Sequence, residues 1–407
     1  MGAAKSGQAA ARLIIHHGGK VKISDNGPDL TPAEFKPWAS QNKIETQWGG
    51  HTQDFIEASD LVVLSPGVPI NAKPVEWAKA KKIPVIGEIE LAYRFCDRPI
   101  IAVTGSNGKT TVSTLIHDLI AEAGYKVCLC GNVGFPFADF VQDLSKTDFI
   151  VLEISSFQLE TIVDFKPHVA VFTNFSQNHL DRHKDVGEYF EAKTRFFMNQ
   201  DKNDFAVLNA QNEWIKKLGS KLKAKVLYFN REKTEINPNY LAVREVAKAL
   251  KIDPQVCEKV FAEFKGVEHR LEFVRTIAGV DYVNDSKATN PEAGRWALEN
   301  IHKPIIMICG GRDKNMNFSV LRDLVGKKVK KMIVIGEAKE KLKNTFKNVV
   351  EVEESAKLDQ AVAMAKTIAS DGDCVLLSPM CASFDMFNNF EHRGEVFKEI
   401  VRNLNGK

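Results

Sequence analysis

The sequence has no long apolar run, and this absence limits where the protein can act. No stretch reaches the length that a helix needs to span a bilayer, and no secretory hydrophobic segment is present. Internal repeats and low-complexity segments are absent too. We therefore expect a cytoplasmic protein without a membrane partner. Its 407 residues predict two or three globular domains.

Paired cysteine motifs and an excess of charge of one sign are also lacking. The seven cysteines are scattered, odd in number and free of any CxxC pair, which argues against a disulfide framework or a zinc site. Lys and Arg total 55 against 52 Asp and Glu, so the net charge is only +3. Such a balance does not predict nucleic acid as a partner. We expect a monomer.

What the sequence does contain is a glycine-rich turn between an apolar strand and a helix. Residues 100–103 predict a buried strand, and residues 112–123 predict a helix. Glycines in the turn let backbone N–H groups approach phosphate oxygens, and the helix N-terminus adds partial positive charge. We therefore predict a phosphate loop, in which Lys109 reaches the terminal phosphates and the Thr110 hydroxyl holds Mg²⁺.

This predicted phosphate loop departs from the usual spacing. Val103 stands where the first glycine is expected, so Gly105 and Gly108 are its glycines. The alternative is a tight strand-to-helix turn with a surface lysine. Agreement among the glycines, the Lys-Thr pair and the strand–helix context favours the phosphate loop.

Three further residues of the middle segment are candidates for the same site. Glu153 ends an apolar run, where a carboxylate suits the Mg²⁺; the alternative is a partly exposed strand-end acid. His179 follows the strand at 169–174, so we place it at the same sheet edge, although a loop histidine is usually a surface residue. Nothing in the pattern distinguishes Lys193 from a surface lysine of the predicted helix 188–197.

The first segment alternates strands and helices. Strands are predicted at 21–25, 61–68 and 83–87, which indicates a parallel α/β layer. The turn from Gly2 to Gly7 resembles a nucleotide-binding turn, with Asp25 at the end of the next strand to meet a ribose or base. Such a turn should follow a strand, and none precedes it in this sequence, so we expect either a truncated N-terminus or a domain that lacks its first strand.

The last segment also alternates strands and helices, with strands predicted from Val280 and at 305–309, 331–336 and 375–377. Polar loops follow its predicted strands, and ligands bind at such carboxyl ends in parallel sheets. We thus predict an α/β protein of three domains. They are a Rossmann-like domain at 1–96, a central P-loop ATPase domain at 97–267 and a Rossmann-like domain at 268–407.

Four motifs resemble those of the Mur ligase family, ATP-dependent amide ligases of peptidoglycan precursor synthesis. They lie at 104–111 (TGSNGKTT), 153–160 (EISSFQLE), 284–291 (NDSKATNP) and 378–394. The resemblance covers nearly the whole chain, and the motifs follow one another in the same order as in the family. The phosphate loop alone would also fit folylpolyglutamate synthase, but the SFQLE run and the C-terminal block argue against it.

The resemblance implies a reaction as well as a fold. D-glutamate would be ligated to UDP-N-acetylmuramoyl-L-alanine: ATP phosphorylates the alanine carboxylate, the D-glutamate amine attacks the acyl phosphate, and a tetrahedral intermediate collapses to amide and phosphate. Charge builds on phosphoryl oxygens, so Mg²⁺ and lysine are needed there. Closure of the third domain onto the second would exclude water.

The resemblance further implies roles for single positions. Lys109, Glu153, His179 and Lys193 would be catalytic. Two Mg²⁺ ions would be held by Thr110, Glu153, His179 and a carbamylated Lys193, since carbamylation turns the cation into a carboxylate-like group. ATP would contact Gly105, Ser106, Asn107, Gly108, Lys109, Thr110, Thr111, Asn239, Arg270 and Asp285. The UDP-linked substrate would contact Lys5, Ser6, Asp25, Asn26, Asn132 and Ser155, and D-glutamate would contact Lys287, Thr289, Lys314, Ser383, Phe384 and Phe390.

The sequence departs from the family pattern in several places, and these keep other functions open. Asn178 stands where the family usually has Asp, the stretch between Arg231 and Asn239 is short, and Arg312 follows the glycine pair where some relatives have Asp. One alternative is a P-loop switch or motor that hydrolyses ATP to drive a partner protein. Another is a paralogue that binds nucleotide without ligating.

Overall fold

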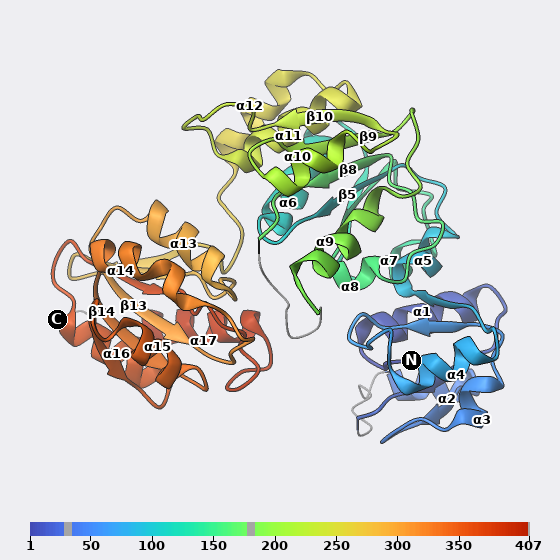
Figure 1. The fold of residues 1–407 in the computed structure, drawn as a ribbon, viewed down its shortest axis with the longest axis horizontal. Helices are drawn as coiled ribbons and strands as arrows, with labels where there is room; N and C mark the ends of the chain where they lie inside the picture. The colour runs from blue at the N-terminus through green and yellow to red at the C-terminus, as the bar shows by residue number, and fades with distance from the viewer. Residues whose placement is uncertain (28–34, 177–183, 406–407) are drawn as a thin grey trace. The chain divides into compact units, whose positions relative to one another are not determined.

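A computed structural model describes residues 1–27, 35–176 and 184–405, which belong to two compact units (Figure 1). The first unit comprises Met1–Phe175 and Asp185–Phe264. The second consists chiefly of Lys265–Lys407. The predicted boundaries at 96/97 and 267/268 stay predictions.

The N-terminal part of the first unit carries two separate parallel strand pairs. Strand β1 (Lys22–Ser24) pairs with β2 (Glu45–Gln47), and β3 (Val62–Leu64) pairs with β4 (Val85–Gly87). Strand β2 was not predicted, because its residues are polar and mostly exposed and no apolar run indicates a strand there. The helices here are α1 (Lys5–His16), α2 (Phe35–Gln41), α3 (Gln53–Glu57), α4 (Lys73–Ala80) and α5 (Glu88–Tyr93).

The rest of the first unit is built on a six-stranded parallel sheet with the strand order β10-β9-β8-β5-β7-β6. Its strands are β5 (Ile100–Thr104), β6 (Val127–Gly131), β7 (Phe149–Glu153), β8 (Val169–Phe172), β9 (Phe205–Asn209) and β10 (Lys225–Phe229). The β5 strand is buried throughout and lies between β7 and β8. Strands covered on both faces require continuous apolar runs, which is why the central strands β5 and β8 were predictable. The carboxyl ends of β5, β7 and β8 therefore meet at one edge.

Helices cover both faces of this sheet (Figure 1). One face carries α6 (Lys109–Glu122), α11 (Pro238–Leu250) and α12 (Pro254–Glu263), whose apolar residues share one core. The core of the other face includes residues of α1 and α5. The remaining helices of this part are α7 (Phe137–Phe140), α8 (Ser156–Leu159), α9 (Val186–Thr194), the 3-10 turn η1 (Arg195–Phe197) and α10 (Glu213–Gly219).

The N-terminal part is tied to the central sheet by buried polar contacts. The Glu90 carboxylate of α5 is fully buried and accepts hydrogen bonds from the backbone N–H groups of Val163 and Phe165 at 2.9 and 3.0 Å. Arg12 of α1 donates to both carboxylate oxygens of Asp139, at 2.9 and 3.0 Å. These bonds and the shared apolar core make one unit of the two parts.

The second unit has a six-stranded sheet in the order β11-β12-β16-β13-β14-β15. Only the β11–β12 pair is antiparallel. The strands are β11 (Glu272–Ile277), β12 (Val280–Asn284), β13 (Ile305–Gly310), β14 (Val329–Ile335), β15 (Glu351–Glu354) and β16 (Cys374–Leu377). One face is covered by α13 (Pro291–Asn300), η2 (Phe318–Leu321), α14 (Arg322–Lys328) and α15 (Lys339–Phe346), the other by α16 (Leu358–Ile368) and α17 (Phe390–Arg402).

The α/β fold class predicted from the sequence is confirmed. The two strands missed in the second unit are the edge strands β11 and β15, both of which carry charged side chains. Edge strands need less apolar surface than central ones, so their pattern is weak. In the part of the chain that the structure describes, no helix is long and apolar enough to cross a membrane.

Candidate functional site

The predicted phosphate loop joins β5 to α6, and its backbone requires glycine. Gly105 has φ 153° and Gly108 has φ 80°. A Cβ on Gly105 would lie 1.9 Å from Thr173 Oγ1, and one on Gly108 would lie 2.9 Å from Asn239 Oδ1. Both glycines are therefore needed for close approach as well as for conformation. Helix α6 begins at Lys109, so its first N–H groups lie at the loop.

The residues after β8 brace this loop. Thr173 Oγ1 and Asn174 Nδ2 both donate to the Asn107 carbonyl, at 2.7 and 3.0 Å. The Asn107 N–H donates to Asn174 Oδ1 at 2.8 Å, and the Ser106 N–H donates to the Asn174 carbonyl at 3.0 Å. Contacts within the protein thus fix the shape of the loop. The sequence analysis missed Thr173 and Asn174 in this role, since no local signal marks a brace.

Lys109 and Thr110 occupy the first turn of α6. The Lys109 ammonium donates to the carbonyls of Gly105 and Ser106 at 3.1 and 3.3 Å, so it lies across the loop. Thr110 is 5% exposed. A plain turn with a surface lysine does not match this arrangement, which suits a phosphate loop.

Glu153 ends β7 and is only 2% exposed, so the alternative of a partly exposed acid is wrong. Its Oε1 accepts from Asn132 Nδ2 at 2.8 Å, whereas its buried Oε2 has no hydrogen-bond partner among the described residues. A buried carboxylate oxygen without a donor is costly unless a cation compensates it. The Glu153 carboxylate and the Thr110 hydroxyl are the hard oxygen ligands that Mg²⁺ prefers, so these residues fit the ion.

Lys193 of α9 is buried, not a surface lysine. Its side chain is 1% exposed, and its Nζ donates to the Gly105 carbonyl at 3.1 Å and to Thr104 Oγ1 at 3.3 Å. Burial and the nearby Lys109 charge hold the pKa of Lys193 well below its usual range, against the opposing pull of Glu153. The helix pattern could not reveal this, because the tertiary packing of α9 decides which face is buried.

Two predicted substrate contacts position their neighbours. Asn132 holds the Glu153 carboxylate, as described above. Ser155 forms the capping box of α8, in which its Oγ accepts from the Gln158 N–H at 3.4 Å and Gln158 Oε1 accepts from the Ser155 N–H at 2.9 Å.

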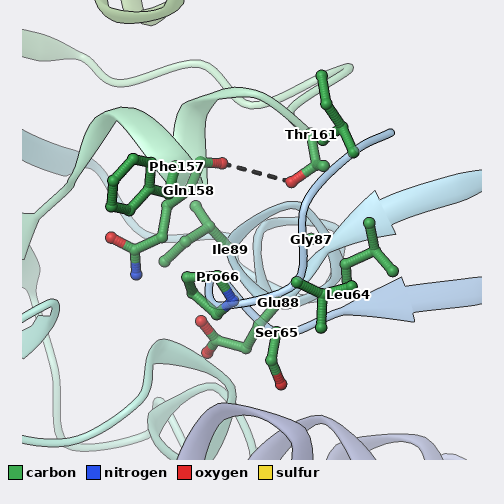
Figure 2. A pocket seen from close by; sticks show the side chains of 11 residues that line it. Leu64, Ser65, Pro66, Gly87, Glu88, Ile89, Phe157, Gln158 and Thr161 are labelled. Atoms are coloured by element: carbon green, nitrogen blue, oxygen red, sulfur yellow. Dashed lines mark hydrogen bonds between the residues drawn. The ribbon is translucent and has the colours of Figure 1, made fainter. Parts of the chain in front are cut away.

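A buried carboxyl group that the sequence analysis missed lies where the N-terminal part meets the central sheet. Glu88 is 2% exposed and borders a small cavity with Ser65, Pro66 and Gln158 (Figure 2). Its Oε1 accepts from the Ala138 N–H at 2.6 Å, and its Oε2 has no hydrogen-bond partner within the described ranges. Burial raises the pKa of Glu88 to about 7.

We predict that ionisation of Glu88 destabilises the first unit as the pH rises. Its pKa is near 4.5 when exposed and about 7 in the fold, so its stabilising contribution is complete below about pH 4.5 and is lost as the pH rises through about 7. The loss amounts to about 3 kcal/mol of unfolding free energy. Urea unfolding of the wild type and of Glu88→Gln across this range measures it.

The matched control for this experiment is Glu232→Gln, which removes an exposed carboxylate. As the pH rises, the unfolding free energy of the wild type should fall relative to that of Glu88→Gln. The difference between the wild type and Glu232→Gln should stay the same at every pH. Parallel curves for all three proteins would show that Glu88 is not held protonated by burial.

The Asp25 carboxylate lies against the N-terminal turn. Asp25 Oδ2 accepts from the Ala3 N–H at 2.7 Å, and its Oδ1 accepts from the Gly27 N–H at 2.8 Å. Lys5 and Ser6 begin α1 beside this turn, and Asn26 is exposed. The Asp25 carboxylate therefore shapes the turn, whatever else it binds.

In the second unit, Asp285 follows β12 and is buried. Its Oδ2 accepts from Ser378 Oγ at 2.9 Å and its Oδ1 from the Leu271 N–H at 3.2 Å. Burial raises the pKa of Asp285 to about 7, although Ser378 and the charge of Arg270 oppose the shift. The predicted residues Arg270 and Asp285 are thus electrostatically coupled.

The loops after β12 and β16 are joined by Arg393, which the sequence analysis did not single out. This arginine is 1% exposed and donates to the Ser286 carbonyl at 2.7 Å and to the Cys381 carbonyl at 3.2 Å. It holds together the segments that carry most of the residues predicted to bind D-glutamate. Among those residues, the Lys287 ammonium lies 4.8 Å from the Phe390 ring centre, Ser383 is buried, Phe384 is 60% exposed, and Thr289 and Lys314 are half-buried.

One predicted residue, His179, lies outside the described residues. The catalytic residues and several of the ATP contacts fall into two groups. Lys109, Thr110, Glu153, Lys193 and Asn239 surround one loop of the first unit, and Arg270 and Asp285 belong to the second unit.

Comparisons with known proteins define the class to which this fold and site belong. Residues 1–87 match the Mur ligase MurD-like N-terminal domain, residues 103–273 the Mur ligase middle domain, and residues 269–381 the Mur ligase glutamate ligase domain. The chain belongs to the Mur ligase family, which confirms the resemblance of its motifs.

Within this family the chain is similar to proteins of one name. A protein of Koribacter versatilis named UDP-N-acetylmuramoylalanine–D-glutamate ligase is 40% identical over 438 residues, covering 99% of this chain and 96% of that protein. A protein of Pelotomaculum thermopropionicum with the same name is 39% identical, covering 99% and 97%. The first alignment is longer than the 407-residue chain, so the relative has residues within it that this chain lacks.

Solved structures agree in fold. MurF from Acinetobacter baumannii gives a TM-score of 0.65 at 14% identity, covering 98% of both chains. MurC from Thermotoga maritima gives 0.60 at 17% identity, also covering 98% of both. At such low identity these likenesses show the three-domain fold alone.

Proposed function

We propose that this protein joins D-glutamate to UDP-N-acetylmuramoyl-L-alanine in an ATP-dependent ligation. The observation that carries the proposal is the phosphate loop with Lys109 and Glu153, in a chain 40% identical along its length to a ligase of that name. The alanine carboxylate attacks the γ-phosphorus and ADP leaves. The D-glutamate nitrogen then attacks the acyl carbon, loses a proton, and expels inorganic phosphate as the amide forms.

The loop residues act on the phosphates. Backbone N–H groups at the start of α6 and the Lys109 ammonium bind phosphoryl oxygens, which carry growing charge during transfer. Thr110 and Glu153 would hold Mg²⁺, which when bound neutralises that charge. Since the protein supplies little covalent chemistry here, the rigid bracing by Thr173 and Asn174 serves catalysis by positioning.

Lys193 is proposed to act as a carbamate. A buried lysine with a strongly lowered pKa carries a neutral amine, and only the neutral amine can attack CO₂. Its nitrogen would bond to the carbon of CO₂ and release one proton, which leaves an anionic carbamate near Lys109. The carbamate and His179 would complete the site for a second Mg²⁺.

Substrate contacts complete the proposal. For ATP they are Gly105, Ser106, Asn107, Gly108, Thr111, Asn239, Arg270 and Asp285. For the UDP-linked substrate they are Lys5, Ser6, Asp25, Asn26, Asn132 and Ser155. For D-glutamate they are Lys287, Thr289, Lys314, Ser383, Phe384 and Phe390. In that last group Lys314 offers a cation to a glutamate carboxylate.

Phosphate release from ATP and Mg²⁺ tests the function. We expect release only when UDP-N-acetylmuramoyl-L-alanine and D-glutamate are both present, little with L-glutamate, and the UDP-dipeptide in the mass spectrum. Release without either acceptor would instead support an ATP-driven switch. If the protein still binds ATP but releases no phosphate in any condition, the result would support a paralogue that binds nucleotide without ligating.

A further inference from the structure

Two residues near the start of the second unit adopt a strained backbone conformation. His269 has φ 63° and Leu271 has φ 44°, which is left-handed backbone. A residue with a Cβ disfavours this conformation, so the surrounding contacts have to hold the segment in place. Arg270, a proposed contact of ATP, lies between the two. The strained turn therefore sets the position from which the Arg270 side chain extends.

Hydrogen bonds to the loop after β12 hold this turn from one side. The Lys287 N–H donates to the His269 carbonyl at 3.0 Å, and the Leu271 N–H donates to Asp285 Oδ1 at 3.2 Å. These bonds fix the carbonyl that precedes Arg270 and the N–H that follows it. The His269 N–H points elsewhere and requires a different acceptor.

The carboxylate of Glu272 is that acceptor. The His269 N–H donates to Glu272 Oε2 at 2.9 Å, and Asn284 Nδ2 donates to the same oxygen at 3.0 Å. Asn284 Nδ2 also lies 3.0 Å from Nδ1 of the His269 ring, which is buried. Glu272 thus closes the turn around Arg270 on the side away from the β12 loop.

Lys398 of α17 holds the other oxygen of the Glu272 carboxylate. Its Nζ lies 3.2 Å from Glu272 Oε1 and 2.8 Å from Glu395 Oε1, and it donates to Glu268 Oε1. The Lys398 side chain is only 4% exposed. Burial opposes the ammonium charge, but the three carboxylates outweigh burial and hold the pKa of Lys398 above its ordinary value. A charged and buried ammonium can therefore fix the direction of the Glu272 carboxylate.

We propose that Lys398 is a positioning residue, which holds Arg270 in place for the ATP phosphates through the carboxylate of Glu272. Lys398 orients the carboxylate, the carboxylate accepts from the His269 N–H, and the turn then sets the direction of the Arg270 side chain. A guanidinium binds phosphate through a planar fork, so a small displacement of its backbone weakens that contact. The inference rests on the proposed function, because Arg270 as an ATP contact is part of that function.

Lys398→Met is the first test, because it removes the ammonium and keeps most of the side-chain length. We expect the KM for ATP to rise about tenfold, whereas the KM for the UDP-linked substrate, whose proposed contacts lie in the first unit, should change less than about twofold. Lys327→Met removes an exposed lysine of α14 and should leave both values unchanged. An unchanged KM for ATP in Lys398→Met would overturn the proposal.

Double variants separate positioning from a general effect on the second unit. In the Arg270→Ala background, Lys398→Met should raise the KM for ATP no further, because the positioned group is gone. Glu272→Gln keeps the side-chain size but weakens the contact with Lys398, so it should raise the KM for ATP by itself, even if Lys398→Met does not fold. Further losses from Lys398→Met in the Arg270→Ala background, or an unchanged KM for ATP in Glu272→Gln, would contradict the proposal.

ATP binding, measured by isothermal titration calorimetry on the full chain, separates this inference from the proposed function. If the wild type binds ATP but does not ligate, the proposed function fails, while a weaker affinity of Lys398→Met for ATP still supports the positioning role. If the wild type ligates and Lys398→Met binds ATP with wild-type affinity, the function stands and the positioning role is overturned.

Discussion

Replacing Lys109 with alanine is expected to abolish phosphoryl transfer without unfolding the protein. The Lys109 ammonium is the cation that lies directly across the phosphate loop, donating to the carbonyls of Gly105 and Ser106. Charge on the phosphoryl oxygens grows in the transition state, so loss of this cation weakens the transition state more than the ground state. We expect turnover to fall by about three orders of magnitude, the scale on which single charge-stabilising groups act.

The loop should survive this substitution, because other residues shape it. Thr173, Asn174 and Asn107 hold it through bonds that do not involve Lys109. Circular dichroism and the unfolding transition should therefore match the wild type. Lys126→Ala, which removes an exposed lysine just beyond α6, is the matched control and should keep full activity. If the activity of Lys109→Ala stays within tenfold of the wild-type activity, a residue other than Lys109 makes the main contact with the transferred phosphate.

The phosphate loop could be predicted from the sequence because its signals are local. A buried strand, two glycines and a Lys-Thr pair lie within a dozen residues, and each restricts the backbone or the chemistry by itself. Glu153 is conspicuous in the sequence for the same reason, as a polar residue that ends an apolar run. Local patterns of this kind specify what a segment can do wherever it lies in the fold.

The supporting residues could not be predicted, because their roles depend on packing. Lys193 stands in an ordinary helical pattern, and only the approach of α9 to the loop buries it. Thr173 braces a loop that is distant in sequence, and Glu88 is buried by α7. Arg393 likewise joins two loops whose proximity comes from the strand order β12-β16-β13.

The same distinction applies to the α/β fold. Central strands such as β5 and β13 were predictable, because burial on both faces demands an uninterrupted apolar run. The edge strands β2, β11 and β15 are polar or charged along much of their length, so pairing geometry rather than composition defines them.

Replacing Lys193 with alanine should remove activity in a form that short carboxylates partly restore. If Lys193 acts as a carbamate, alanine deletes an anionic metal ligand and leaves a cavity beside Gly105 and Thr104. Acetate or formate can enter such a space and supply the missing oxygens. We expect a loss of at least about a hundredfold, the upper range for groups that organise a metal site, and a recovery that saturates with carboxylate.

Two controls separate the carbamate from a purely structural lysine. Chloride at equal ionic strength should not restore Lys193→Ala, and acetate should not restore Lys109→Ala, whose missing group is a cation. Wild-type enzyme freed of CO₂ should lose activity and regain it on addition of bicarbonate, because the buried neutral amine is the species that adds CO₂. The carbamate is contradicted if carboxylates fail to restore the activity of Lys193→Ala and if removal of CO₂ leaves the wild-type activity unchanged. Lys193 would then serve as a buried amine that donates to the Gly105 carbonyl. The second metal site would require another anionic ligand.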